Sequence, residues 1–171
     1  MKEDWETAIS FVLKMEGGET AELDPNDPGG LTKYGISQKA YPNLNIKDLT
    51  LEQAKDIYYK DYWLPCSCDE LPTIYAISVF DTAVNQGVGK SKRLLQISLN
   101  MDEVDGVIGP KTIAASWKAP VSKMKKYLAV RLADYAKIMS DNPKLLCYAV
   151  NWSYRVLSLY ELIISTKKET A

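Results

Sequence analysis

The sequence contains no histidine among its 171 residues, and this absence excludes several kinds of enzyme. A Ser-His-Asp triad, a Cys-His pair and an H-E-x-x-H zinc site each need an imidazole side chain. The hydrolytic chemistry that remains open is that of carboxyl groups. If the chain is an enzyme, we therefore expect it to work without a metal ion or other cofactor.

Cysteine is scarce as well. Cys66, Cys68 and Cys147 form an odd set, and the C-x-C pair has neither the spacing nor the partners of a zinc site. We interpret the three residues as packed or free thiols. A disulfide to Cys147 stays open for an exported protein, because oxidising compartments favour such bonds.

The chain also lacks a marked excess of charge and a long apolar run. Its 21 basic residues nearly balance its 22 acidic ones, which argues against binding of nucleic acid through phosphates. No stretch is apolar enough for a membrane span. The start Met1-Lys2-Glu3-Asp4 does not resemble a signal peptide. We expect synthesis in the cytoplasm, no nucleic-acid partner and a monomer.

Apolar residues, by contrast, make up 46% of the chain, enough for a sizeable core in one domain or two closely packed lobes. Helix signals dominate and strand signals are sparse, so we predict an all-α or mainly α fold with at most a small β-hairpin at residues 32–36. A helix is predicted for residues 90–100, and two long helices for the last third. Predicted helix starts are a Thr50–Gln53 capping box, Pro72, Pro110, Ser122 and Asn142.

The first apolar pattern of the chain leads to a glutamate. Its members, spaced by three and four residues as on a buried helical face, are Trp5, Ala8, Ile9, Val12 and Leu13. Glu16 continues this face, and Gly17-Gly18 is a predicted helix end. Burial and the negative end of the helix dipole would both disfavour ionisation of Glu16, so that its carboxyl group could donate a proton near neutral pH. The alternative is a glutamate that turns to solvent at a frayed helix end.

A polar loop rich in glycine and proline follows. It carries Asp24, Asp27 and Thr32 around Gly29-Gly30, and its prolines restrict the backbone. Such a loop would place a rigid polar wall opposite the glutamate, although an ordinary turn has the same composition. A calcium loop fits poorly, since Pro28 stands where an EF-hand has its third ligand.

The run from Glu16 to Ser37 resembles the motif of the glycoside hydrolase family 108 muramidases, which are phage and bacterial lysozymes. In that family E-G-G is followed by D-P-x-D-x-G-G-x-T-x-x-G-I-[ST], and the chain matches with residues 16–18 and 24–37. The likeness continues through residues 62–63, 80–87, 95–96, 105–112 and 151–156. The family usually has an aromatic residue after E-G-G and an asparagine before D-P, where this chain has Glu19 and Leu23.

This resemblance implies a lysozyme-like helical fold, bacterial cell-wall peptidoglycan as the partner, and Glu16 as the catalytic acid. It divides the chain into a muramidase region, residues 1–89, and a helical peptidoglycan-binding-like region, residues 90–171. The motif from Asp105 to Thr112 belongs to the second region. Lytic release, as in phage infection, or a dedicated secretion system would then bring the protein from the cytoplasm to the cell wall.

The same segments supply candidates for substrate binding. Within the loop motif these are Asp24, Asp27, Thr32 and Tyr34. Asn85 and Gln86 follow an apolar helical face, so their amide groups either meet the N-acetyl and hydroxyl groups of a sugar or cap the helix. Tyr62 and Trp63 either stack on a sugar ring or pack in the core. Asp81, four residues before Asn85, is a candidate for orienting it.

For the reaction, we expect Glu16 to protonate the leaving oxygen of the β-1,4 link between N-acetylmuramic acid and N-acetylglucosamine. Asp24, Asp27 or Thr32 would hold the water or stabilise positive charge at the anomeric carbon. The separation of two carboxyl groups would decide between retention and inversion. Two rivals stay open: a lytic transglycosylase, which forms an anhydro sugar, and a cell-wall-binding module without catalysis.

Overall fold

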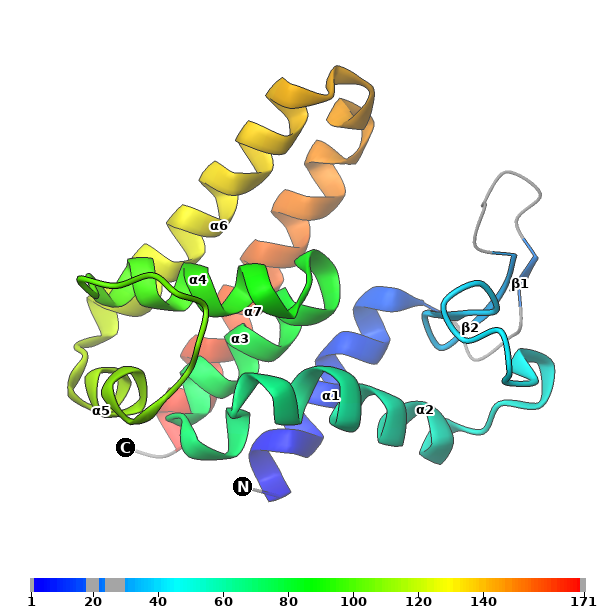
Figure 1. Ribbon diagram of the computed structural model, residues 1–171, viewed down its shortest axis with the longest axis horizontal. Coiled ribbons are helices and arrows are strands. Elements are labelled where there is room, and N and C mark those ends of the chain that lie inside the picture. The colour runs from blue at the N-terminus through cyan, green and yellow to red at the C-terminus, as the bar shows by residue number, and fades with distance from the viewer. Residues whose placement is uncertain (1, 18–21, 24–29, 170–171) are drawn as a thin grey trace.

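The structure is a computed structural model that describes residues 2–17, 22–23 and 30–169. It is mainly helical, as predicted from the sequence (Figure 1). The helices are α1 Lys2–Glu16, α2 Leu51–Tyr58, α3 Thr73–Gln86, α4 Val88–Leu99, α5 Pro110–Lys118, α6 Val121–Asp141 and α7 Ala149–Glu169. The strands are β1 Glu22–Leu23, β2 Leu31–Lys33 and β3 Ile36–Ser37. Short helical segments are η1 Ile46–Asp48, η2 Tyr59–Trp63, η3 Leu64–Cys66, η4 Cys68–Glu70 and η5 Pro143–Tyr148.

Helix α3 forms the centre of the molecule. All of its residues from Tyr75 to Ala83 are buried, and it packs against α1, α4 and α7. A helix buried around its whole circumference is one that other helices enclose. A single hydrophobic cluster extends from Ala8 in α1 to Ile163 in α7, so both halves of the chain contribute to one core. The division at residue 89 stays a prediction.

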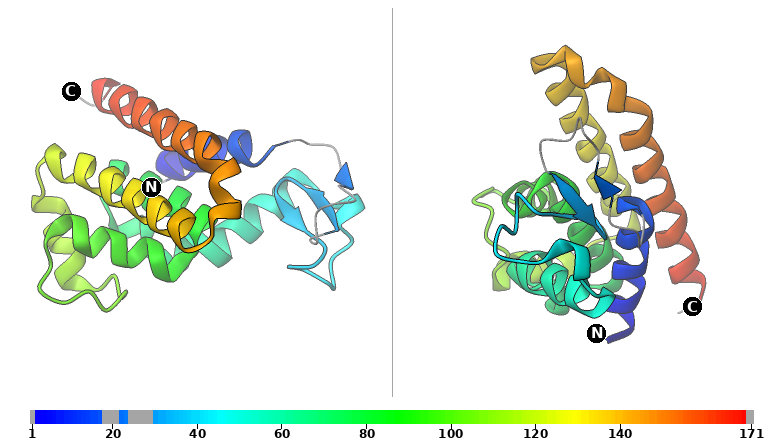
Figure 2. Two further views of the ribbon diagram at one scale, coloured as in Figure 1. Left: turned by 90° about the horizontal axis from the view of Figure 1, so that it is seen from above. Right: turned by 90° about the vertical axis from the view of Figure 1, so that its right-hand side faces the viewer.

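Helices α6 and α7 form a long antiparallel hairpin that rises away from the body (Figures 1 and 2). The prediction of two long helices in the last third is confirmed, but their starts differ from those expected. Helix α6 begins at Val121, directly after Pro120, rather than after Ser122. Residues after Asn142 first form the tighter turn η5, and α7 begins only at Ala149. Pro143 at the start of η5 suits a first turn, because its missing N–H would be unpaired there anyway.

Local signals set the other helix starts. The Thr50 hydroxyl accepts the backbone N–H of Gln53 at 3.2 Å, and Gln53 Oε1 accepts that of Thr50 at 2.9 Å, which confirms the capping box at α2. Helix α5 begins at Pro110, as predicted, and α3 begins directly after Pro72. The helix expected at residues 90–100 spans Val88–Leu99.

The strands form one antiparallel sheet at the end of the molecule away from α5 (Figure 1). The predicted hairpin is present, and β1 adds a third strand to it, with Glu22 paired to Thr32. Lys33 pairs with Ile36 across a two-residue turn, in which Tyr34 and Gly35 have φ of 53° and 76°. Positive φ at both central residues gives a turn whose twist matches that of the strands.

Two further expectations concern cysteines and membrane spans. Cys66 and Cys68 are buried and Cys147 is exposed, all three as free thiols, in line with the prediction of packed or free thiols. Across the described residues, no helix has an apolar stretch of the length needed to cross a bilayer.

Candidate active site

Glu16 is the last residue of α1. Gly17 follows with φ of 87°, a left-handed conformation that ends the helix where the sequence predicted. The Glu16 side chain is 24% exposed, so its carboxyl group lies at the boundary between core and solvent.

This side chain lines a cavity of about 90 Å³. Tyr41, Tyr58 and Tyr62 contribute to its wall, and the turn between β2 and β3 contributes Gly35. Burial, with a further contribution from the Glu16 carboxylate, raises the pKa of Tyr58 well above its ordinary value. A cavity of this size holds part of a ligand, such as the atoms around one bond, rather than a whole saccharide.

The hairpin turn packs directly on Glu16. A Cβ atom added to Gly35 would lie 2.7 Å from Cβ of Glu16 and 2.6 Å from the hydroxyl oxygen of Tyr58. The Tyr58 hydroxyl in turn donates a hydrogen bond of 2.9 Å to the carbonyl oxygen of Tyr34. Only glycine fits at position 35, because the place of a side chain is taken by the glutamate and the tyrosine.

An arginine from the last helix contacts the glutamate. Arg155 Nη1 donates to Glu16 Oε1 at 2.5 Å. Burial alone would lower the pKa of Arg155, but the carboxylates of Asp81 and Glu16 outweigh burial and raise it. Arg155 is therefore charged at every physiological pH. From the sequence, only burial and the helix dipole were expected to act on Glu16, and the structure adds a guanidinium.

Behind Arg155 lies a second, fully buried ion pair. Asp81 accepts hydrogen bonds from Arg155 Nε at 2.8 Å and from Arg131 Nη1 at 2.6 Å. Burial opposes ionisation of Asp81, but the two guanidinium groups outweigh it and hold the pKa of Asp81 below its usual value. Two positive charges, one from each arginine, thus compensate the buried carboxylate.

Asn85 and Gln86, predicted for substrate binding, point to helix α6. Asn85 Oδ1 accepts a hydrogen bond from the Tyr135 hydroxyl, which itself accepts from Arg131. Asp81 therefore does connect to Asn85, through these two side chains rather than by direct contact. Gln86 Nε2 donates to Asp134 Oδ2 at 2.7 Å. The binding role of both amides stays a prediction.

The predicted aromatic pair is divided between cavity and core. Tyr62 lines the cavity with Glu16, whereas Trp63 is fully buried and donates its indole N–H to Asp69 at 2.9 Å. The structure thus places Trp63 in core packing, the second of the two roles considered for it. Tyr62 keeps both roles, since it is half-buried beside the ring of Tyr58.

The loop candidates are only partly visible. Thr32 lies on β2 and donates to the carbonyl oxygen of Gly30 at 3.3 Å. Tyr34 lies in the hairpin turn, and its carbonyl oxygen accepts a hydrogen bond from the Tyr58 hydroxyl. Asp24 and Asp27 lie outside the described residues. In the part of the chain that is described, no three carboxylate, cysteine or histidine side chains gather as they would around a metal ion.

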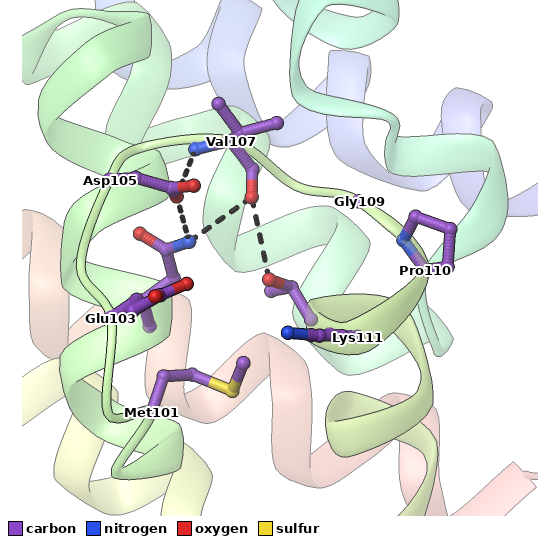
Figure 3. A pocket seen from close by; sticks show the side chains of 9 residues that line it. Met101, Glu103, Asp105, Val107, Gly109, Pro110 and Lys111 are labelled. Atoms are coloured by element: carbon purple, nitrogen blue, oxygen red, sulfur yellow. Dashed lines mark hydrogen bonds between the residues drawn. The ribbon is translucent and has the colours of Figure 1, made fainter.

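A second and larger cavity, about 450 Å³, lies at the motif from Asp105 to Thr112 (Figure 3). Gln96 fixes this loop: its amide donates to Asp105 Oδ1 at 2.6 Å and to the Val107 carbonyl at 3.1 Å, and it accepts the backbone N–H of Gly106 at 2.8 Å. Figure 3 shows Glu103 and Lys111 on opposite sides of the opening. The predicted peptidoglycan-binding motif thus borders a cavity with a charged side chain on either side.

Sequence reasoning missed most of the residues that surround Glu16. Arg155 and Gly35 were noticed only as parts of motifs, and Tyr41 and Tyr58 were not singled out as site residues. The one available signal was the glycine after Tyr34, at a position in a short hairpin where positive φ is common. The pairing of Glu16 with Arg155 spans 139 residues, and nothing in local spacing indicates it.

Comparisons with known proteins agree with this picture. Residues 9–87 match the family model described as Glycosyl hydrolase 108. A solved structure titled "Structure of Brucella abortus SagA" is 28% identical in sequence and superposes with a TM-score of 0.79, covering 96% of each chain. No curated protein matches the sequence. The predicted lysozyme-like helical fold is thereby confirmed.

Proposed function

We propose that this protein cleaves the glycan strands of bacterial peptidoglycan, with Glu16 as general acid, because residues 9–87 match the glycosyl hydrolase 108 family model. The observation that carries the proposal is the position of Glu16: a helix-end carboxyl group, 24% exposed, on the wall of a cavity lined by tyrosines. A carboxyl group in such surroundings can reach a ligand while most of its surface is shielded from water.

In the proposed reaction Glu16 protonates the oxygen of the β-1,4 link between N-acetylmuramic acid and N-acetylglucosamine. The bond from this oxygen to the anomeric carbon breaks as the proton arrives, and the bond electrons remain with the oxygen. Asp24, Asp27 or Thr32 then holds the attacking water or stabilises the charge at carbon. Released lytically or by secretion, the protein acts at the cell wall as an N-acetylmuramidase of the endolysin kind.

The test is Glu16→Gln, which keeps the shape of the side chain and removes the acidic proton. Clearing of a suspension of purified cell walls should fall by at least about 10²-fold, while the thermal midpoint stays close to that of the wild type. Glu3→Gln, an exposed glutamate on the same helix, is the matched control and should remain active. Unchanged clearing by folded Glu16→Gln would overturn the assignment.

Product analysis separates the proposal from a lytic transglycosylase. A muramidase adds one water to the muramic acid end, whereas a transglycosylase releases an anhydro product that is lighter by that water. Mass spectrometry of the fragments decides between them. The anomeric configuration of the first product, read by proton NMR, then shows whether the reaction retains or inverts.

Residues 90–171 are proposed to hold the protein on peptidoglycan. The support is the cavity at residues 105–112, where Lys111 and Glu103 offer opposite charges to a ligand that carries both amino and carboxylate groups, such as a peptide stem. Lys111→Ala should weaken sedimentation with insoluble walls. It should leave the cleavage of short soluble fragments unchanged, because Lys111 lines the second cavity and not the one at Glu16.

A further inference from the structure

Four charged residues from four different helices form a continuous chain of ion pairs that ends at Glu16. Its order is Glu16 in α1, Arg155 in α7, Asp81 in α3 and Arg131 in α6. The nitrogen-to-oxygen distances are 2.5 Å, 2.7 Å and 2.6 Å. The charges alternate along the chain, so each carboxylate has a guanidinium as its neighbour.

Burial increases along this chain, away from the cavity. The side chain of Glu16 is 24% exposed and that of Arg155 is 8% exposed, whereas those of Asp81 and Arg131 have no exposed surface. The inner pair is therefore fixed by its surroundings, because separating two buried charges is costly. Arg155 is anchored to the inner pair through Nε and Nη2, and its Nη1 reaches Glu16. The planar guanidinium thus bridges two carboxylates in one fixed geometry.

We infer that Arg155 is a positioning residue that orients the Glu16 carboxyl group and stabilises the carboxylate that forms as the proton leaves. This inference rests on the proposed role of Glu16 as general acid. The proton passes from Glu16 to the glycosidic oxygen, and the negative charge that remains on Glu16 is met by a cation already in place. A preorganised charge of this kind needs no rearrangement at the moment of reaction.

The charge balance of the chain supports this role. With Glu16 ionised, two carboxylates and two guanidinium groups sum to zero. With Glu16 protonated, the same four residues carry one net positive charge in a largely buried region. Proton transfer therefore moves the excess positive charge from these four residues to the substrate, and the attraction between Arg155 and Glu16 is stronger after the transfer than before it.

The other titratable groups that face Glu16 do not compete with Arg155. Tyr58 from α2, Tyr62 from η2 and Tyr41 from the segment after β3 line the same cavity. Burial raises the pKa of all three tyrosines above the ordinary value, and they are uncharged at neutral pH. Arg155 contacts Glu16 from behind the cavity wall, with Nη1 at 2.5 Å from Glu16 Oε1.

The experiment measures kcat and KM of the full chain on soluble glycan fragments between about pH 4 and pH 9, for Arg155→Met, Arg155→Lys and Arg131→Met. We expect Arg155→Met to lower kcat by about 10- to 100-fold with KM changed less than about threefold. Because Arg155→Met removes a positive charge beside Glu16, the alkaline limb of the pH–rate profile should move to higher pH.

The variants Arg155→Lys and Arg131→Met distinguish the effect of the positive charge at Glu16 from the effect of lost packing. Arg155→Lys keeps a positive charge but cannot bridge two carboxylates, so kcat should fall while the alkaline limb stays in place. Arg131→Met also removes a buried guanidinium from Asp81, but it leaves the contact with Glu16. It should lower the thermal midpoint as Arg155→Met does, without moving the alkaline limb.

Three outcomes would overturn the inference. One is a wild-type kcat and pH profile in folded Arg155→Met. Another is a shift of the alkaline limb of the same size in Arg131→Met. If Arg155→Met does not fold, a wild-type kcat in Arg155→Lys would overturn the inference instead. Glu16→Gln is measured alongside: if it stays active, the proposed function itself fails, whereas an inactive Glu16→Gln beside an unaffected Arg155→Met rejects the positioning role alone.

Discussion

Gly35 lies so close to Glu16 that a Cβ atom at position 35 would be 2.7 Å from Cβ of the glutamate. Gly35 also has φ of 76°, a conformation that residues with a side chain rarely adopt. The hairpin turn thus packs against the last turn of α1 and limits where the backbone of Glu16 can lie. Any displacement of the turn is passed on to the glutamate.

Gly35→Ala is expected to displace Glu16 or the turn, since neither the Cβ of Glu16 nor the hydroxyl of Tyr58 can yield without moving its own backbone or hydrogen bond. Wall clearing should fall by about 10²-fold, as small displacements of catalytic groups cost that much. The left-handed backbone adds a stability loss of about 1–2 kcal/mol. Turbidity assays and thermal unfolding would measure the two effects separately.

Gly106→Ala is the matched control for the stability lost when alanine is forced into a left-handed backbone conformation. Gly106 has φ of 79°, and an added Cβ would meet only the flexible side chain of Arg93, at 3.3 Å. The control should lose similar stability and keep its activity on soluble fragments. Equal activity of both alanine variants would show that the contact between Gly35 and Glu16 has no part in the reaction.

Tyr62 offers a test of sugar stacking at the cavity. Tyr62→Ala should raise KM by about tenfold, and Tyr62→Phe should not, because an aromatic face rather than the hydroxyl would contact the ring of a sugar. Tyr148→Ala removes a more exposed tyrosine from the distant turn η5, where Tyr148 stacks on Trp152. A KM that is the same in all four proteins would assign Tyr62 to packing.

Asp81 should make the stability of the fold depend on acidity. Its pKa in the folded protein lies below the ordinary value of 3.8, so the folded state favours the carboxylate. The stabilisation is complete above about pH 4 and is lost as the pH falls from there through the lowered pKa. Asp81→Asn should cost about 3–5 kcal/mol at neutral pH, because two buried guanidinium groups lose their partner.

Urea unfolding at pH 7 and at about pH 3 would test this. The free energy of unfolding should differ between wild type and Asp81→Asn at pH 7, and the difference should shrink at the lower pH. Lys137→Met, which breaks an exposed ion pair with Asp141, is the comparison and should leave the free energy of unfolding almost unchanged. A difference that is constant with pH would contradict the lowered pKa.

Gln96 should govern the second cavity and not the first. Gln96→Ala leaves the Gly106 amide and the Asp105 carboxylate without their buried partner, so it should lower the thermal midpoint and loosen this loop. If the cavity binds peptidoglycan, sedimentation with walls should weaken while cleavage of short soluble fragments is retained. Parallel loss of binding and cleavage would point instead to a fold-wide defect.

Sequence could predict the features that depend on neighbouring residues. The end of α1 at Glu16 followed from an apolar face and a glycine, the start of α2 from the exchange between Thr50 and Gln53, and the start of α5 from Pro110. Each involves residues within a few positions of one another. The hairpin was predicted for the same reason, whereas β1 was not, because a two-residue strand carries no periodicity.

The candidate site itself was predicted only at its centre. Glu16 and Tyr62 do line one cavity, but the cation at Glu16 comes from α7, and the packing of α7 on α3 is a tertiary event without local pattern. The position of α6, which carries Tyr135, decides the partner of Asn85 in the same way. A sequence shows that an amide is available on a helix, while the neighbouring helices decide its partner.

The bridge from Glu16 to Arg155 also determines which part of the chain can be exchanged between proteins. A chimera that carried only residues 1–89 into another scaffold would bring Asp81 and Glu16 without either of their counter-ions, which lie at positions 131 and 155. Both carboxylates would then lie in a scaffold that offers no guanidinium group to pair with them. Recombination that preserves the enzyme must transfer the α6–α7 hairpin together with the first helix, so inheritance and engineering alike have to treat the two ends of the chain as one unit.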